Sequence, residues 1–176
     1  DMKTYNYSDL FSNYLNCKTI LLPCVSAYIG ADITSGIYFL GREALSNKIL
    51  FIDLGTNGEI VLSDGKNIYC ASAAAGPAFE GASIKDGVGS IAGAICNIEI
   101  ENGEIKYNTI NNEEPVGICG SGIIDITAEG ITNLLIDKTG KLEKEKIELV
   151  KTDKTISFYQ KDVREVQLAK SAKHSG

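Results

Sequence analysis

Asp53-Leu-Gly-Thr-Asn-Gly-Glu59 connects two strand-like runs, Ile49 to Ile52 and Ile60 to Leu62. An acidic residue therefore follows an apolar strand and precedes a turn that contains glycines, a hydroxyl and an amide. Such a turn can present backbone N–H groups to a phosphate, while the carboxylate can hold Mg²⁺ beside it. We predict Asp53 as the metal-associated, catalytic acid, and the following residues as phosphate ligands: Gly55, Thr56, Asn57, Gly58 and Glu59.

The same turn also fits an ordinary hairpin, in which Gly55 and Gly58 supply positive φ angles and Asn57 caps the turn. Two details favour a functional turn. A carboxylate at the end of an apolar strand is costly to bury without a cation or hydrogen-bond donors. Thr56 places a hydroxyl at the apex, within reach of a phosphate oxygen. Glu59 could equally begin the outward face of the next strand.

A second glycine cluster, Gly117-Ile-Cys-Gly-Ser-Gly122, opens directly into an apolar, helix-like stretch. Glycines here would let a flat base or a ribose lie against the backbone close to a helix N-terminus. The predicted nucleotide contacts are Gly117, Gly120, Ser121 and Gly122, with Asp125 in the first helical turn as an acceptor for a ribose hydroxyl. The alternative is a strand-to-helix turn that needs glycine for steric reasons, with Asp125 favouring the helix dipole.

A third glycine-bounded segment, Gly76-Pro-Ala-Phe-Glu-Gly81, predicts a rigid turn. A structural corner after a buried strand is one interpretation. In the other, Glu80 is a catalytic residue that orients a water molecule or hydrated Mg²⁺. A P-loop and a dinucleotide-binding fingerprint are both absent from the sequence.

The composition limits the class of protein. The chain has 176 residues, enough for one domain, and its 44% hydrophobic content can form a core. A net charge of −6, without a basic cluster, argues against a nucleic-acid partner. Five cysteines without close pairing predict reduced, mostly buried thiols in a cytoplasmic protein, and we find neither a signal peptide nor a membrane span. The helix-like end of the sequence suggests a piece of a longer protein.

The apolar patterns predict an α/β domain with flanking helices. A three-stranded antiparallel meander begins a mixed sheet, and a hairpin follows it. The expected strands are 49–54, 59–63, 67–73, 94–101, 104–109 and 156–159, and the expected helices include 25–40 and 121–136. We expect 140–153 to be a solvated, charged excursion. Asp162 is the predicted cap of a terminal helix, with Glu165 completing a capping box.

Five sequence blocks, in this order, resemble successive motifs of the ATP-dependent reductive activators of corrinoid proteins. They span most of the chain: Leu22-Pro-Cys-Val-Ser-Ala-Tyr-Ile-Gly-Ala-Asp32, Phe51 to Val61, Ala75 to Gly81, Gly117 to Asp125 and Asp162 to Lys170. The resemblance implies the actin, sugar-kinase and heat-shock-chaperone ATPase superfamily, in which two ribonuclease-H-like lobes close on ATP. It also implies that Asp53 to Glu59 is the second phosphate-binding turn and Gly117 to Asp125 the adenosine motif.

The same resemblance implies ATP and Mg²⁺ as cofactors and a parent protein that reduces Co(II) corrinoid to Co(I) for methyl transfer. The expected partner is a corrinoid protein or its methyltransferase, and a homodimer is considered as well. The first phosphate-binding turn and the cysteine cluster of a [2Fe-2S] domain have no counterpart in the sequence. We therefore expect a C-terminal lobe that does not hydrolyse ATP by itself, within a parent that carries the iron–sulfur cluster.

Three alternatives stay open. An activator of 2-hydroxyacyl-CoA dehydratases would share the ATPase fold, but Cys119 has no second cysteine after it to ligate a cluster. A small-molecule kinase of the same superfamily would have its substrate loop in the other lobe. A non-enzymatic alternative is a β-rich interaction domain that docks a corrinoid protein, with weak nucleotide affinity and little ATPase activity of its own.

Overall fold

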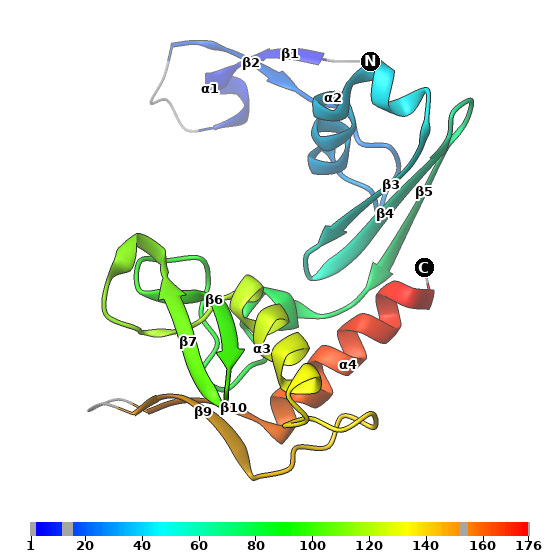
Figure 1. Ribbon diagram of the computed structural model, residues 1–176. Coiled ribbons are helices and arrows are strands. Elements are labelled where there is room, and N and C mark those ends of the chain that lie inside the picture. Colours follow the sequence, from blue (N-terminus) through cyan, green and yellow to red (C-terminus); the bar gives the residue numbers. More distant parts are fainter. Residues whose placement is uncertain (1–2, 12–15, 152–154, 176) are drawn as a thin grey trace. The chain divides into compact units, whose positions relative to one another are not determined.

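The computed structural model describes residues 3–11, 16–151 and 155–175 (Figure 1). The chain folds into two compact units. The first contains the residues up to Asp53 and Glu59–Ser72, and the second contains Leu54–Gly58 and Ala73–Gly176. The expected single domain stays a prediction.

The expected meander forms the main sheet of the first unit. Its strands, in the order β3-β4-β5, are β3 (Lys48–Leu54), β4 (Asn57–Asp64) and β5 (Ile68–Ala74). The Asp64-Gly65 corner closes the second hairpin, because the Asp64 carboxylate accepts hydrogen bonds from the backbone N–H groups of Lys66 and Asn67. Gly65 there has a φ of 89°, a value that favours glycine.

Helix α2 (Ala31–Leu45) packs on this sheet around a small core of Ile29, Ile33 and Val61. Gly36 permits the contact, since a Cβ there would lie 2.8 Å from the ring of Phe51. The helix expected over 25–40 is wrong at its start, because a short turn bridged between Ser26 and Ile29 precedes α2. Gly41 interrupts α2 with a φ of 76°, and helix resumes after it.

A two-stranded antiparallel sheet of β1 (Lys3–Asn6) and β2 (Lys18–Leu21) completes the first unit, with the one-turn helix α1 (Tyr7–Leu10).

The second unit has a mixed sheet in the order β7-β6-β8. Strand β6 (Ala94–Glu101) pairs antiparallel with β7 (Glu104–Thr109), as expected, and parallel with the short β8 (Gly117–Ile118). The 3-10 turn η1 (Pro77–Glu80) precedes β6 along the chain, and the 3-10 turn η2 (Ile110–Asn112) lies between β7 and β8. Helix α3 (Gly120–Thr132) begins directly after β8 and packs on β6 through Ile123 and Ile126, both fully buried.

The expected solvated excursion over 140–153 is wrong in its second half. Strand β9 (Lys146–Lys151) pairs antiparallel with β10 (Thr155–Tyr159), and Ile147, Leu149 and Val150 enter the core of the second unit. The charged residues of β9 face outward while its apolar residues face inward. The alternating charges therefore indicated a solvated segment although the residues form a strand. Helix α3 also ends earlier than expected, because Leu134, with a φ of 59°, leads into a turn in which the Leu135 and Ile136 N–H groups bond to the Gly130 carbonyl.

The terminal helix α4 spans Gln160–Ser175. The prediction of Asp162 as its cap is wrong, since Asp162 is the third helical residue and is wholly buried. Its carboxylate accepts the N–H groups of Tyr159, just before the helix, and of Lys85, each within 2.9 Å. Asp162 thus binds the N–H group that precedes the helix, which is the role that the predicted capping box gave to Glu165.

Candidate functional site

Thr56 is the centre of the first glycine turn, and the 75–80 segment holds every polar group of Thr56. The Thr56 carbonyl accepts hydrogen bonds from the N–H groups of Ala75 and Gly76, at 3.0 and 2.9 Å. The Thr56 N–H donates to Glu80 Oε1 at 2.8 Å, and the hydroxyl donates to Glu80 Oε2 at 2.7 Å. Both oxygens of one carboxylate are therefore bound by one threonine.

Lys173 on α4 supports the same turn from a distant part of the sequence. Its Nζ donates to the Gly55 carbonyl at 3.2 Å and lies 5.8 Å from the centre of the Phe79 ring. A Cβ at Gly58 would lie only 2.7 Å from Lys173 Cγ, so glycine at this position lets the lysine stem approach. The sequence alone did not indicate Lys173, because a lysine near the end of a charged helix has no distinguishing local pattern.

The second glycine cluster forms the β8-to-α3 connection. A Cβ at Gly120 would lie 2.0 Å from the Phe79 carbonyl oxygen, and one at Gly122 would lie 2.4 Å from the Ile95 carbonyl oxygen. Both glycines are needed because another backbone passes against them. The Ser121 hydroxyl donates to the Cys96 carbonyl at 2.7 Å, and Gly117 is buried in β8.

The two glycine segments meet the same short element of the second unit. The 3-10 turn η1 contributes Glu80 to Thr56, and Phe79 to Gly120. A glycine with a positive φ lies at each end of η1. Gly76 precedes the turn, and Gly81, in the left-handed region, follows it. The structure thus brings together, around η1, two segments that are far apart in the sequence.

Asp125 has partners within the fold. It lies in the second turn of α3 rather than in the expected first turn. Its Oδ2 accepts hydrogen bonds from the Ile98 N–H at 3.1 Å and from Asn97 Nδ2 at 3.2 Å. This carboxylate therefore joins α3 to β6, and its contact with a ribose stays a prediction.

Glu80 is exposed and ionised. Hydrogen bonds from the Thr56 hydroxyl and N–H, aided by the charge of Lys173, lower the pKa of the Glu80 carboxyl below its usual value. The predicted role of Glu80 was to orient a water molecule or hydrated Mg²⁺. In the structure its two oxygens bind Thr56 instead, so any catalytic role of Glu80 stays a prediction.

The two acids that flank the turn belong to the first unit. Asp53 is the penultimate residue of β3. Glu59 is buried on β4, and its Oε1 accepts a hydrogen bond from the Ser72 hydroxyl at 3.4 Å. The alternative that placed Glu59 on an outward face is therefore wrong. Asn57, which was expected to contact phosphate, is exposed.

The Thr56 turn suits an anionic ligand. The donor pair of Thr56 already binds an anionic oxygen pair, which shows that the turn accommodates one. Within the described ranges, no three His, Cys, Asp or Glu side chains cluster to hold a metal ion.

The cysteines differ from the expectation of mostly buried thiols. Cys119 is buried, whereas Cys17 and Cys24 are exposed. Cys70 and Cys96 are half-buried, and burial raises the pKa of the Cys70 thiol. Among the helices that the structure describes, none is both long and apolar enough to cross a membrane.

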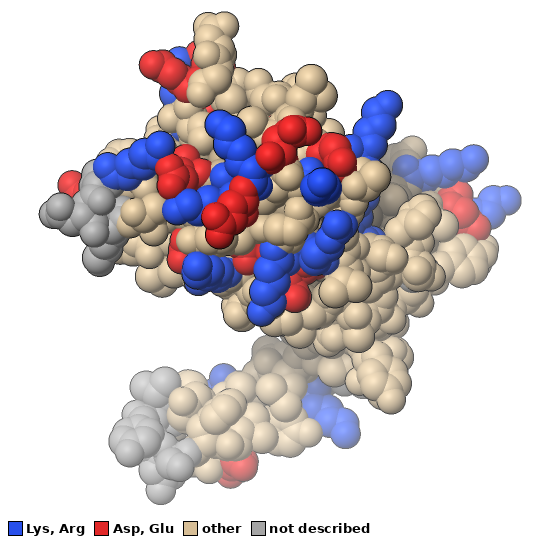
Figure 2. All heavy atoms as spheres, turned by 90° about the horizontal axis from the view of Figure 1, so that it is seen from below, with Lys and Arg blue, Asp and Glu red and all other residues tan. Residues whose placement is uncertain are grey.

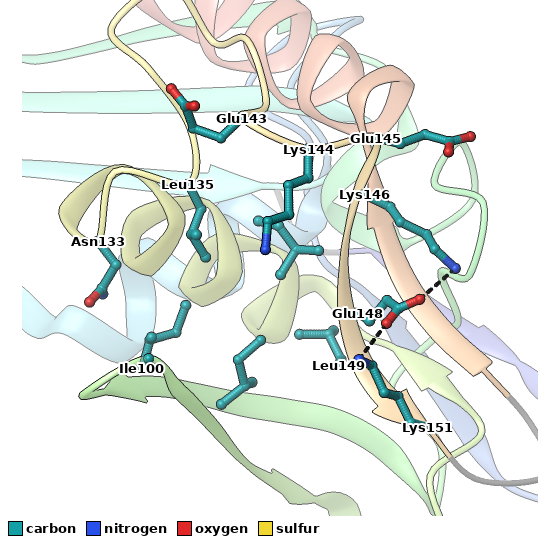
Figure 3. A pocket seen from close by; sticks show the side chains of 13 residues that line it. Ile100, Asn133, Leu135, Glu143, Lys144, Glu145, Lys146, Glu148, Leu149 and Lys151 are labelled. Atoms are coloured by element: carbon teal, nitrogen blue, oxygen red, sulfur yellow. Dashed lines mark ion pairs between the residues drawn. The ribbon is translucent and has the colours of Figure 1, made fainter.

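A cavity of about 830 Å³ lies elsewhere in the second unit and includes no residue of the glycine segments (Figure 3). Ile100, Leu135 and Leu149 contribute apolar side chains to it, and Lys144 extends over them. On one side, Glu148 binds two ammonium groups, Lys146 at 2.9 Å and Lys151 at 2.7 Å. Figure 2 shows that basic and acidic side chains are interspersed over the face that it displays.

These two lysines make Glu148 a pH-sensitive contributor to stability. Hydrogen bonds from Lys151 and Lys146 lower the pKa of Glu148 from 4.5 to about 2. A lowered folded-state pKa stabilises the fold above pH 4.5, and this contribution disappears as the pH falls toward 2. We expect the difference in unfolding free energy between the wild type and Glu148→Gln to shrink over that range, as measured by urea unfolding. Glu143→Gln, an exposed acid of the same cavity, should show a smaller change.

Comparison with known proteins places this chain in a family. A family model described as "C-terminal domain of RACo the ASKHA domain" matches residues 47–176. The chain belongs to this family. The match covers the sheet β3-β4-β5 and both glycine segments, and it confirms the expected ASKHA fold class and the resemblance to corrinoid activators.

Two curated proteins are similar to this RACo-type ASKHA chain. One is the "Corrinoid activation enzyme RamQ" of Eubacterium limosum, 37% identical over an alignment of 180 positions that covers 88% of this chain and 30% of that protein. The other is the "[Co(II) methylated amine-specific corrinoid protein] reductase" of Methanosarcina barkeri, 32% identical over an alignment of 189 positions that covers 94% of this chain and 34% of that protein. The chain spans about a third of the length of these relatives.

A solved structure described as "Reductive activator for corrinoid,iron-sulfur protein" matches with a TM-score of 0.78 and 37% identity. The match covers 86% of this chain and 27% of that protein. The identity and the TM-score together place the RACo-type chain in the same fold and family as that activator.

Proposed function

We propose that this chain is the nucleotide-binding lobe of an ATP-dependent activator that reduces an inactive Co(II) corrinoid protein to the Co(I) state. The observation that carries the proposal is the arrangement around η1, where Thr56 offers two donors to an anion and Gly120 of the second glycine segment packs against Phe79. The names of the similar proteins support the corrinoid part of the proposal.

In this proposal each segment has one task. The Gly55 to Gly58 turn binds phosphate oxygens, with Thr56 as the main donor. Gly117, Gly120, Ser121 and Gly122 lie against the nucleoside, and Asp125 faces its ribose. Asp53 holds Mg²⁺, which supplies positive charge at the phosphates when it is bound. Lys173 keeps the turn in place through its hydrogen bond to the Gly55 carbonyl.

The corrinoid protein, or the methyltransferase that uses it, is the proposed partner. Nucleotide binding would favour one conformation of the lobes and hence one complex with that partner. A [2Fe-2S] cluster elsewhere in the longer protein would deliver the electron. We also propose a cytoplasmic location, a homodimer as one assembly, and no ATP hydrolysis by the isolated chain.

Nucleotide binding can be tested by thermal unfolding of this chain. A ligand that binds only the folded state stabilises it, by about 1.4 kcal/mol when its concentration is tenfold above Kd. We expect Mg-ATP to raise Tm in a concentration-dependent way. Thr56→Val, which lacks the hydroxyl donor, should reduce the shift, while Thr109→Val on β7 should leave it unchanged. Absence of a shift at millimolar Mg-ATP would favour a docking domain instead.

A further inference from the structure

In the first glycine turn, the donors of Thr56 already bind an anionic group of the protein itself, the Glu80 carboxylate. Glu80 places one carboxylate oxygen 2.8 Å from the Thr56 nitrogen and the other 2.7 Å from the Thr56 hydroxyl. These are the two donors that a phosphate would use in the proposed function. A carboxylate offers a pair of anionic oxygens with a spacing similar to that of two phosphate oxygens.

The arrangement allows Glu80 to leave without disturbing the turn. Glu80 and Thr56 are both exposed, so the carboxylate can move into water. Thr56 would stay in position, because its carbonyl is held separately by the N–H groups of Ala75 and Gly76. Lys173 would also keep its hydrogen bond to the Gly55 carbonyl. Rotation of a single side chain is then sufficient to uncover both donors.

We propose that Glu80 is an internal competitor of phosphate, which covers the Thr56 donors in the empty protein and is displaced when a nucleotide binds. The inference rests on the proposed function and adds to it a requirement on the ligand that binds. A ligand must bring an anionic oxygen pair to replace the carboxylate, so neutral ligands such as a nucleoside gain nothing from this turn. The negative charge of Glu80 also repels a phosphate until the carboxylate moves away.

Calorimetric titration with Mg-ATP and with inorganic pyrophosphate separates this role from a supporting one. Glu80→Gln keeps the size of the side chain but removes its charge, so it holds the Thr56 donors less strongly. We expect Glu80→Gln to bind both ligands about threefold to tenfold more tightly than the wild type. Glu99→Gln, which changes an exposed glutamate of β6, is the matched control and should bind like the wild type.

The outcomes distinguish the two proposals. If the wild type binds Mg-ATP and Glu80→Gln binds it equally or more weakly, Glu80 supports the site and the competitor role is wrong. If neither protein binds Mg-ATP or pyrophosphate, the proposed function fails, and the competitor role fails with it.

A second measurement needs no substitution. The carboxyl carbon of Glu80 can be followed by NMR during an acid titration, with and without saturating pyrophosphate. In the empty protein the Thr56 hydrogen bonds lower the pKa of this carboxyl. Displacement removes these bonds and brings a negative charge nearby, so the pKa should rise on binding. A pKa that stays equally low in the complex would overturn the proposal.

Discussion

Replacing Gly120 with alanine is expected to lower the free energy of unfolding by about 3 kcal/mol. The new Cβ would lie 2.0 Å from the Phe79 carbonyl oxygen, a distance that no side-chain rotation can relieve, because the opposing atom is backbone. Either α3 or η1 would have to move. Urea unfolding, with the midpoint and the slope measured separately, gives the change in stability.

Gly89→Ala is the matched control for Gly120→Ala. Gly89 lies in a loop of the same unit, and a Cβ there would meet no atom within 4 Å. The stability of Gly89→Ala should stay within about 0.5 kcal/mol of the wild type. A Gly120→Ala variant as stable as this control would contradict the close contact between η1 and α3.

The Gly120→Ala variant also links the two glycine segments. Movement of η1 would shift the preceding Ala75 and Gly76, whose N–H groups hold the Thr56 carbonyl in the other segment. The Mg-ATP shift in Tm should therefore weaken in the fraction of Gly120→Ala that still folds. An unaltered shift would indicate that the two segments act independently.

Replacing Asp53 with asparagine in the full-length protein is expected to reduce ATP hydrolysis about 100-fold or more. The proposed role of Asp53 is to hold Mg²⁺ at the phosphates, and asparagine keeps the shape but loses the charge that attracts the cation. Loss of a preorganised charge at a phosphoryl group typically costs two to three orders of magnitude in rate. Steady-state phosphate release, with Mg²⁺ varied, is the measurement.

One result would assign the loss to cation binding, and another would contradict the Asp53 prediction. If high Mg²⁺ partly restores the rate of Asp53→Asn, the loss lies in cation binding. If the variant hydrolyses ATP at the wild-type rate, Asp53 is not the metal-associated acid. Glu43→Gln, an exposed acid of α2 in the same unit, serves as the control and should retain full activity.

Local signals in the sequence predicted the turns and the elements beside them. Asp64-Gly65 predicted a hairpin because its conformation depends on neighbouring residues. The Gly117 to Gly122 cluster likewise predicted a strand-to-helix connection, although the exact helix ends differed. For β9 the alternation of charges misled the interpretation, since the burial of Ile147 and Leu149 depends on the partner strand β10.

The candidate site shows the same division. The residue types of the phosphate turn were evident from the sequence, because a glycine turn after an apolar strand is a local pattern. The partners of that turn were not. Glu80 and Lys173 reach it from positions 24 and 118 residues away, and no pattern near either residue indicates such a contact.

The sequence by itself determined the family-like motifs, the meander and the donor groups of the turn, since these follow from the order of neighbouring residues. Tertiary structure alone decided that η1 joins the two glycine segments, that Asp162 is buried, and that a carboxylate covers Thr56. Such contacts depend on packing between distant segments, which local chain geometry does not specify.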